Sequence, residues 1–550
     1  MSLNELEFER NYLEKLPNIV LIPWHYNNER TPSYPLYGKR EIFCGPKLKN
    51  NDTRKRKFVH TSSFFFDIDE VLSQLNKEDE KIDLIVANLQ VNTTCFPKNL
   101  SKINSPKIAL VADTHHLKHS ISSIIHYVKR EKFDHILKFA QPAHLHFFHE
   151  AGIRNSAFWP CFKVKFDAVS NKRIGVTYIG EKWSPFQIRR SRMVKFLENN
   201  LPKHKIPFHY YERLPRIEWL NVLRNSQIIA ICSLNGQFTP QICGCLFAGA
   251  LCFVDELSPQ SFLYRFFKPR KHLVTWRSFE DLLKKLIYYY YHPKKLETIA
   301  KAGKLHAENT FYTDESYALS ISEFAFKNKI NPTLLAINDK RCDSKRDESP
   351  EYFNARVRLY ENIQELHRFH EFLTLISITD KNLKPSMDLA DLPRLKITHA
   401  FTSNDLRNEA DLFFQSVGVS HQIETALLNE IQKFNAHDIG ILEKQANQAV
   451  WKYMVRSISK FLKSNSILWV LGKLSSFEKE ILRREGFKPY NFNRSSVVLK
   501  IKNLSKKICL QFWKMGMYPF PYLTLKPTMD PVPNLNVFLR GWQNYFPFLY

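Results

Sequence analysis

The sequence predicts an α/β protein with two tandem Rossmann-like domains and a C-terminal α/β or α+β extension. Short apolar, β-branched segments alternate with amphipathic ones through the first part of the chain, a pattern typical of parallel sheets covered by helices on both faces. The 550 residues exceed what one hydrophobic core supports and suggest about three domains. We expect domains at 1–165, 166–330 and 351–550, with the polar, charged segment 331–350 as a linker.

The first series of elements has strands expected at 19–24, 83–89, 107–113, 135–140 and 156–160, and helices at 67–77, 120–131 and 142–152. The basic run 50–58 is expected to be a loop. At the start of helix 67–77, Asp67 and Glu70 fit a capping box. The alternative is a cation-binding Asp-x-Asp pair formed by Asp67 and Asp69.

The second series has strands expected at 173–181, 208–212, 228–234 and 272–276, and helices at 189–200, 216–226, 279–292 and 293–311. Between them lies QICGCLFAGALCFVDE, residues 241–256. Cys243 and Cys245 lie two apart, so a helix turns them about 200° away from each other and disfavours a metal clip. The stretch is also too short to cross a membrane. It therefore predicts a small-residue helix and then a buried strand with an acidic end.

The last third of the chain gives weaker signals. Segment 466–490 predicts a strand, a helix and a turn at Gly486, and 495–502 predicts another strand. The proline-rich segment 518–538 is expected to wrap over the surface. No Gly-x-Gly-x-x-Gly motif follows any strand here, so no dinucleotide or S-adenosylmethionine site is predicted.

The composition narrows the class of protein and its environment. The 80 basic and 54 acidic residues give a net charge of +26, which favours polyanionic partners such as phosphates, membranes or nucleic acid. The basic residues are dispersed, so a solvated basic surface is the competing interpretation. Nine unpaired-looking cysteines and the lack of a signal sequence predict a cytoplasmic protein with reduced thiols.

Two groups of histidines could carry chemistry. Asp113, His115 and His116 follow an apolar strand, and ligands bind beyond the carboxyl ends of parallel strands. They could contact substrate, bind a metal, or form a turn in which Asp113 caps backbone amides. His144, His146 and His149 lack the spacing of a two-histidine zinc helix and are expected on a surface helix. No metal site is predicted.

Four segments in order resemble GT-B glycosyltransferases, specifically the group-1-like family related to CgeB-type spore maturation proteins. They are KIALVADTHH…CF, VTYIGE…R, LNGQFTPQICGCLFAGALCFVDE and YYYYHPKKLETIAKAGKLHAENTFYTDESYALSISEF, and they span about residues 80–325. The resemblance implies two Rossmann-like domains, with the acceptor on the first and a nucleotide-diphosphate sugar on the second.

The resemblance also implies residue roles. Gly180 and Asn235 are expected near the donor phosphates, with Arg189 of the following helix favouring negative charge. Helix 241–249 is expected beneath the nucleotide, with Gly249 at a tight turn and Asp255 at the end of the next strand. Gln241 and Gly244 stand where the family usually has an arginine and a ribose-binding acid. Asp113 is expected to orient His115 or His116 as the base.

The expected function is therefore metal-independent transfer of a sugar to a cell-envelope glycan, a lipid-linked saccharide or a protein, without a bound cofactor. The alternative is a degenerate, non-catalytic GT-B protein that binds glycan or nucleotide, motivated by Gln241 and Gly244. No specific nucleic-acid partner is expected. Peripheral association with the inner face of the membrane remains open, because anionic headgroups attract basic residues.

Overall fold

The computed structural model describes most of the two α/β series and much of the last third. The described residues are 14–24, 37–46, 48, 55–63, 65–77, 81–89, 95–112, 114, 120–139, 141–160, 166, 174–180, 188–212, 214–233, 236–330, 333–336, 339–343, 348–367, 370, 372–379, 382–431, 436–489 and 535–539. By internal contacts the chain forms two compact units. The first contains 1–116, 123–338 and 518–524, and the second contains 117–122, 339–517 and 525–550.

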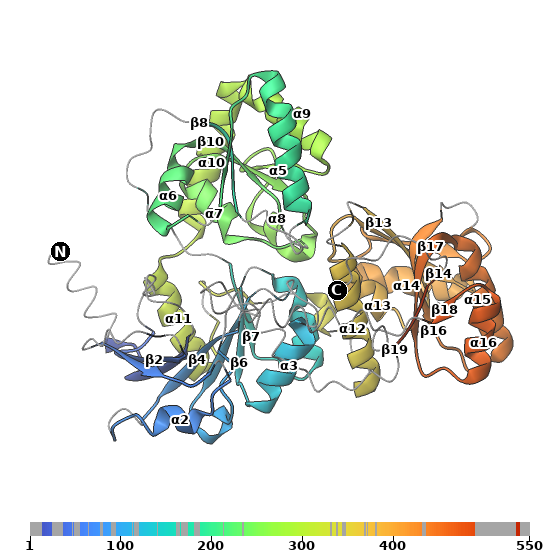
Figure 1. Ribbon diagram of the computed structural model, residues 1–550, viewed down its shortest axis with the longest axis horizontal. Helices are drawn as coiled ribbons and strands as arrows, with labels where there is room; N and C mark the ends of the chain where they lie inside the picture. The colour runs from blue at the N-terminus through green and yellow to red at the C-terminus, as the bar shows by residue number, and fades with distance from the viewer. Residues whose placement is uncertain are drawn as a thin grey trace. The chain divides into compact units, whose positions relative to one another are not determined.

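The first unit holds two parallel sheets (Figure 1). The first has the order β3-β2-β1-β4-β5-β6-β7 with every described pair parallel. Its strands are β1 (Ile19–Pro23), β2 (Arg40–Gly45), β3 (Arg56–His60), β4 (Leu84–Leu89), β5 (Lys107–Val111), β6 (His135–Phe139) and β7 (Ser156–Trp159). Central strands such as β4 are buried almost throughout, as expected for a sheet with both faces covered.

The helices of this series are α2 (Ile68–Leu72), α3 (Ser120–Arg130) and α4 (Leu145–Glu150), the last preceded by a 3₁₀ turn at Pro142–His144. A further helix, α11 (Asp314–Lys327), comes from much later in the chain. Its Tyr317, Ile321 and Phe324 are buried in one core with strand residues of the first sheet. A ring nitrogen of His135 in β6 also bonds the carbonyl oxygen of Ala325 (3.1 Å). The end of the second series therefore closes on the first sheet.

The second sheet is parallel and has the order β12-β11-β10-β8-β9. Its strands are β8 (Ile174–Ile179), β9 (Phe208–Tyr211), β10 (Ser226–Ile231), β11 (Leu251–Asp255) and β12 (Val274–Trp276). Its helices are α5 (Ile188–Asn200), α6 (Arg216–Asn225), α7 (Pro240–Phe247), α8 (Leu263–Phe266), α9 (Phe279–Tyr290) and α10 (Pro293–Thr310).

Alternation along β10 shows how both faces of the second sheet are filled. Ile229 and Ile231 point into a core with α7 and the end of α10, whereas Ile228 and Ala230 point into a core with α5 and α9. Successive strand residues face opposite sides, so a strand covered twice must be apolar at every position. The predicted tandem Rossmann-like α/β fold is thus confirmed, and the predicted domain boundaries stay predictions.

The second unit holds a third sheet of order β15-β14-β13-β16-β17-β19-β18. Its elements are α12 (Pro350–His367), β13 (Leu373–Ile378), α13 (Lys384–Leu389), β14 (Leu395–Phe401), α14 (Asn404–Ser416), β15 (Ile423–Leu427), β16 (His437–Glu443), α15 (Gln448–Phe461), β17 (Leu462–Leu471), α16 (Ser476–Arg484), β18 (Lys488–Pro489) and β19 (Leu535–Leu539). The first five strands in sheet order are parallel, and β19 is antiparallel to both β17 and β18.

Several local predictions need correction. The basic run 50–58 is not wholly a loop, because Arg56–His60 forms the edge strand β3, beside β2. The proline-rich segment 518–538 is not all surface covering, because its last described residues form strand β19, and residues 518–534 lie outside the described residues. The predicted strand 495–502 lies outside the described residues. The predicted turn at Gly486 is confirmed, with φ of 88° after α16.

The cap at Asp67 is confirmed, with a different partner for Glu70. The Asp67 carboxylate accepts from the Asp69 amide (3.1 Å) at the start of α2. Glu70 does not return to the cap but accepts from the Ser62 hydroxyl (2.9 Å). Both acids thus fix the chain around α2, which is the ordinary role of acids at a helix N-terminus.

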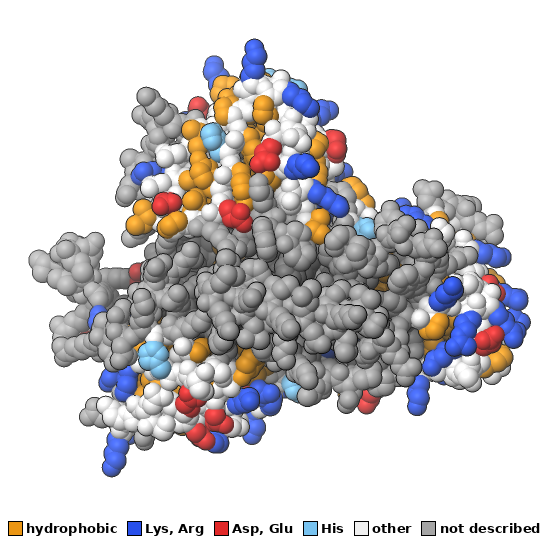
Figure 2. All heavy atoms as spheres, viewed as in Figure 1, with side chains coloured by type: hydrophobic (Ala, Val, Ile, Leu, Met, Phe, Trp, Pro, Cys, Tyr) orange, Lys and Arg blue, Asp and Glu red, His pale blue; other side chains and the backbone are white. Residues whose placement is uncertain are grey.

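The surface and the described helices bear on the membrane question. Figure 2 shows Lys and Arg side chains scattered among other residues on the described part of the visible face. Among the described helices, none combines the length and apolar character required to cross a bilayer.

Candidate functional site

The carboxyl edge of the second sheet brings together several predicted donor-site residues. The strand order changes direction between β8 and β10, and ligands of open parallel sheets bind outside the carboxyl ends at such a point. Gly180 follows β8, Arg189 opens α5, Gln241 opens α7 and Asp255 ends β11. Sequence positions far apart therefore meet at one edge. Asn235 lies outside the described residues.

A buried ion pair forms the base of this edge. An Arg189 Nη1 atom lies 2.7 Å from Asp255 Oδ2, and the two side chains are only 7% and 0% exposed. Asp255 also accepts hydrogen bonds from the amide (2.8 Å) and hydroxyl (2.9 Å) of Ser233, just beyond β10. The Arg189 guanidinium lies over the Trp276 ring, 4.7 Å from its centroid, a favourable cation–π position. These contacts tie α5, β10, β11 and β12 together.

Polar groups at the end of β8 are also bound within the protein. The Gly180 amide donates to the Tyr211 carbonyl (3.0 Å) at the end of β9. The Gln241 side-chain amide donates to the Ile179 carbonyl (2.6 Å), so the first turn of α7 is fixed to β8. Burial raises the pKa of the Tyr178 phenol, which keeps this hydroxyl protonated. The edge is therefore preorganised by internal hydrogen bonds.

The glycine at 249 has a clear structural role. It has φ of 68° and follows α7, where a left-handed residue ends many helices. Its amide donates to the Leu246 carbonyl (2.9 Å) and the next amide, of Ala250, donates to the Cys245 carbonyl (3.2 Å). This is the Schellman arrangement, so Gly249 makes the predicted tight turn into β11.

Gly244 faces a neighbouring helix at close range. A Cβ atom added there would lie 2.8 Å from the Trp219 ring and 3.3 Å from Leu223, both on α6. Trp219 packs against the core that includes α7. A side chain at 244, including the acid expected by analogy, would have to displace this indole. The helix pair is thus built around the absence of a side chain at this position.

Substituting Gly244 with alanine tests this packing. We expect a loss of about 1–2 kcal/mol in the first unit's free energy of unfolding, because overpacking outweighs the helix preference of alanine. In a Trp219→Ala background the same change should instead stabilise by up to about 1 kcal/mol. Hydrogen exchange of the β10 amides measures both. If Gly244→Ala changed stability equally in the wild-type and Trp219→Ala backgrounds, the close contact with the Trp219 ring would be contradicted.

On the first sheet, the predicted acceptor-side residues Asp113, His115 and His116 lie outside the described residues. Their described neighbour Thr114 is buried and lies 2.8 Å from His144 Nδ1. His144 is fully buried, so placing it on a surface helix is wrong. The signal was Pro142, which starts a 3₁₀ turn ahead of α4 and turns His144 inward.

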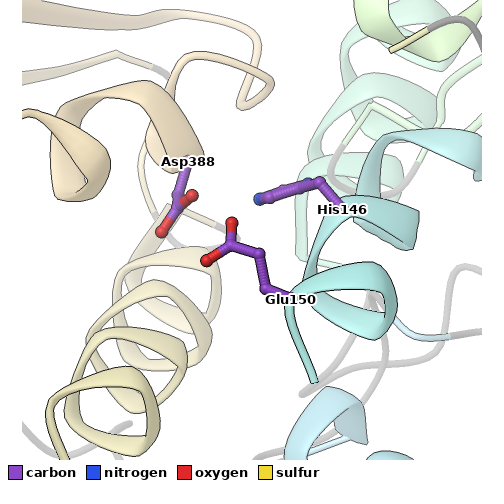
Figure 3. Close-up of side chains that lie close together, drawn as sticks. All are labelled: His146, Glu150 and Asp388. Carbon is purple, nitrogen blue, oxygen red and sulfur yellow. The ribbon is translucent and has the colours of Figure 1, made fainter. Parts of the chain in front are cut away.

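His146 is also fully buried rather than on the surface. Its Nδ1 lies 2.7 Å from the Ala143 carbonyl and therefore carries the proton as donor. Figure 3 shows His146 and Glu150 projecting from successive turns of α4, and it also draws Asp388 of α13 in the second unit. His149 bonds the Ser156 hydroxyl of β7. Of the three histidines, His149 thus ties α4 to its own sheet, whereas His146 bonds the 3₁₀ turn that leads into the helix.

Comparison with known proteins adds one sequence match and several distant structures. Residues 166–318 match a family model described as glycosyl transferase-like. No curated protein matches the chain. Among solved structures, TarM is 11% identical, with 42% of this chain and 52% of that chain covered and a TM-score of 0.31. The precorrin-6y C5,15-methyltransferase of Geobacter metallireducens GS-15 is 11% identical, with 27% and 80% covered and a TM-score of 0.23.

A third structure, the fibrillarin of Aeropyrum pernix with bound S-adenosyl-L-methionine, is 13% identical, with 22% of this chain and 59% of that chain covered and a TM-score of 0.19. The family match can be mapped onto a definite part of the fold. It begins just before β8, covers the whole second sheet and ends within α11. The second sheet with its helices is therefore similar to the glycosyl transferase-like family.

Proposed function

We propose that this protein is a glycosyltransferase that binds a nucleotide-diphosphate sugar at the carboxyl edge of its second sheet. The observation that carries the proposal is the glycosyl transferase-like match over 166–318, which coincides with the sheet whose switch point holds the predicted residues. The CgeB-type relationship and the metal independence belong to the same proposal. The acceptor would be a cell-envelope glycan, a lipid-linked saccharide or a protein, bound on the side of the first sheet.

In the proposed reaction an acceptor hydroxyl attacks the anomeric carbon of the donor. A carbon–oxygen bond to the acceptor forms, the bond to the diphosphate breaks, and the hydroxyl proton passes to a base. His115 or His116 is the proposed base, oriented by Asp113. Gly180, Asn235 and the first turn of α7 are proposed to lie along the diphosphate, where backbone amides stabilise negative charge.

Arg189 and Asp255 are proposed as positioning residues. Because they neutralise each other and are almost completely buried, they hold α5 and Ser233 in place rather than offering a free charge to the donor. Gln241 is proposed to hold the first turn of α7 against β8 while its side chain borders the diphosphate. The peripheral membrane association is proposed on the basic surface alone.

A panel of UDP-, GDP-, dTDP- and ADP-sugars tests the proposal. At least one is expected to raise the melting temperature and to release its nucleoside diphosphate, faster when acceptor extracts are added. Binding without release would support the alternative of a non-catalytic nucleotide-binding protein. If no sugar nucleotide shifts melting or is consumed, the proposal is wrong.

A charge-matched pair of variants then locates the donor. Gln241→Glu adds a carboxylate at the proposed diphosphate edge and should raise KM about tenfold, which is about 1.4 kcal/mol. Gln227→Glu adds the same charge at the amino-terminal end of β10, on the opposite edge of the sheet, and should leave KM within about twofold. Equal effects of the two variants would place the donor elsewhere.

A further inference from the structure

The third sheet has a strand order that is informative by itself. When the strands are numbered by their order in the chain, their order across the sheet is third, second, first, fourth, fifth, seventh and sixth. Only the seventh, β19, runs antiparallel to its neighbours. This is the sheet of S-adenosylmethionine-dependent methyltransferases. In such a sheet the cofactor would lie outside the carboxyl ends of β13 and its neighbours, where the order changes direction between β13 and β16.

The turn after β13 does not suit a closely bound nucleoside. Close approach of backbone to a cofactor is usually achieved with glycines, and the sequence from Leu373 to Leu395 contains none. The Thr379 hydroxyl donates to the Asn382 carbonyl (2.7 Å), which closes the described part of the turn on itself.

A buried histidine ties this turn to the elements around it. His399 of β14 is fully buried, and its Nε2 donates to the Thr379 carbonyl (3.0 Å). Its Nδ1 then accepts from the Ser386 hydroxyl of α13 (2.8 Å). Through His399, the turn after β13 is therefore linked by hydrogen bonds to both β14 and α13.

Four charged side chains, from α12, the segment leading into it and α13, form what we call the α12–α13 ion cluster. It consists of Glu348, Arg356, Lys384 and Asp388, each at most 8% exposed. Arg356 bonds Glu348 (2.9 Å) and Asp388, and Lys384 lies 3.6 Å from Glu348. Two positive and two negative charges thus balance without any ligand. Balanced pairing is what buried charges require.

The first turn of α12 reaches the same edge of the sheet. Burial raises the pKa of the Tyr352 phenol, and the nearby charge of Glu443, the last residue of β16, raises it further. Lys384 begins α13 shortly after the end of β13. The ion cluster and Tyr352 therefore lie by the carboxyl ends of β13 and β16, the two strands that flank the switch point.

The end of β14 also lacks the group that a nucleoside needs. Dinucleotide and related sites read a ribose hydroxyl with an Asp or Glu soon after the second strand. Here the chain reads Phe401, Thr402, Ser403, and the next acid, Asp405, lies in the first turn of α14 rather than at the end of the strand. Ser403 caps α14 through the Leu406 amide (3.4 Å). The cofactor that the fold implies does not fit these residues.

We infer that the second unit retains a methyltransferase-type sheet whose cofactor crevice is closed by its own side chains. It takes no S-adenosylmethionine, and the α12–α13 ion cluster with the His399 clamp stabilises the edge where a cofactor would otherwise lie. The inference concerns the second unit only and is independent of the proposed transferase site in the first.

Equilibrium dialysis of the full chain against labelled S-adenosylmethionine, with S-adenosylhomocysteine in thermal melts, tests the inference. We expect no saturable binding and a melting shift below about 1 °C at about 1 mM ligand. Saturable binding with a Kd below about 100 μM would overturn the inference. Binding of a sugar nucleotide, measured on the same preparation, tests the proposed site in the first unit separately. Failure of one proposal therefore does not imply failure of the other.

A variant distinguishes closure from ligand binding. If the cluster closes the crevice, Arg356→Met should lower the melting temperature of the ligand-free second unit by about 10 °C, because two buried carboxylates lose their arginine and only Glu348 keeps a cation, Lys384, nearby. Arg456→Met, which removes a 58% exposed arginine paired with Glu485, should change it by less than about 2 °C. An Arg356 variant that melts as the wild type without ligand would overturn the inference.

Discussion

Replacing Asp255 with alanine is expected to lower the free energy of unfolding of the first unit by about 3–5 kcal/mol. The change leaves the Arg189 guanidinium charged, buried and without its carboxylate. It also removes the acceptor for the Ser233 amide and hydroxyl. The lost stability comes mainly from the uncompensated charge of Arg189, because a side chain that is only 7% exposed is poorly solvated by water. Hydrogen exchange at β10 and β11 reads the effect within this unit.

The next residue supplies a matched control. Glu256 pairs with Arg277 (2.6 Å), but these side chains are 43% and 76% exposed. Glu256→Ala removes the same kind of charge one position further along and should cost at most about 1 kcal/mol. If Asp255→Ala does not yield folded protein, Ser233→Ala should still show an intermediate loss of about 1–2 kcal/mol. Similar losses for Asp255→Ala and Glu256→Ala would show that the buried pair does not hold the edge.

Acidification is expected to destabilise the second unit through His399. Burial lowers the pKa of this imidazole from 6.5 to about 4, while the Thr379 carbonyl opposes the shift. The unfolded chain therefore binds a proton between these pH values that the folded unit does not. The contribution is fully present above pH 6.5 and is lost progressively down to about pH 4, by a total of about 3 kcal/mol.

The measurement is urea unfolding of the second unit at several pH values, with His399→Gln for comparison. A glutamine amide can still donate to the Thr379 carbonyl but does not titrate. We expect the variant to be less stable near neutral pH and the wild-type advantage to shrink as pH falls toward 4. Burial also lowers the pKa of His437 in β16, and this effect cancels in the difference. A constant difference across the pH range would contradict the assignment.

The sequence was most informative where side-chain periodicity is local. In β10 and β11 the runs Ile228–Ile231 and Leu251–Val254 are wholly apolar, and Thr239, Pro240 and Gly249 mark the start and end of α7. These signals depend on residues a few positions apart, so they can be read without tertiary information. The second series of elements and its likeness to glycosyltransferases followed from them.

Elements with polar interior residues were missed for the opposite reason. β14 carries Thr398 and His399 in its interior, and β3 begins with Arg56 and Lys57. These residues look like loop or surface positions until their partners are known. His399 is satisfied by the turn after β13 and by α13, and Arg56 by Glu41 on β2 (3.0 Å). A buried polar residue is acceptable only when a distant group completes its hydrogen bonds.

By itself, the sequence determined the α/β class, the second sheet with its helices and the edge where a donor is expected. Only the tertiary structure decided what the candidate residues do. Arg189 and Asp255 are far apart in the chain yet neutralise each other, and the place beside Gly244 is filled by Trp219. The physical reason is the sequence distance between the residues that interact. Helix and strand periodicity depends on residues a few positions apart, whereas charge pairing and close packing depend on segments that meet only in the folded protein.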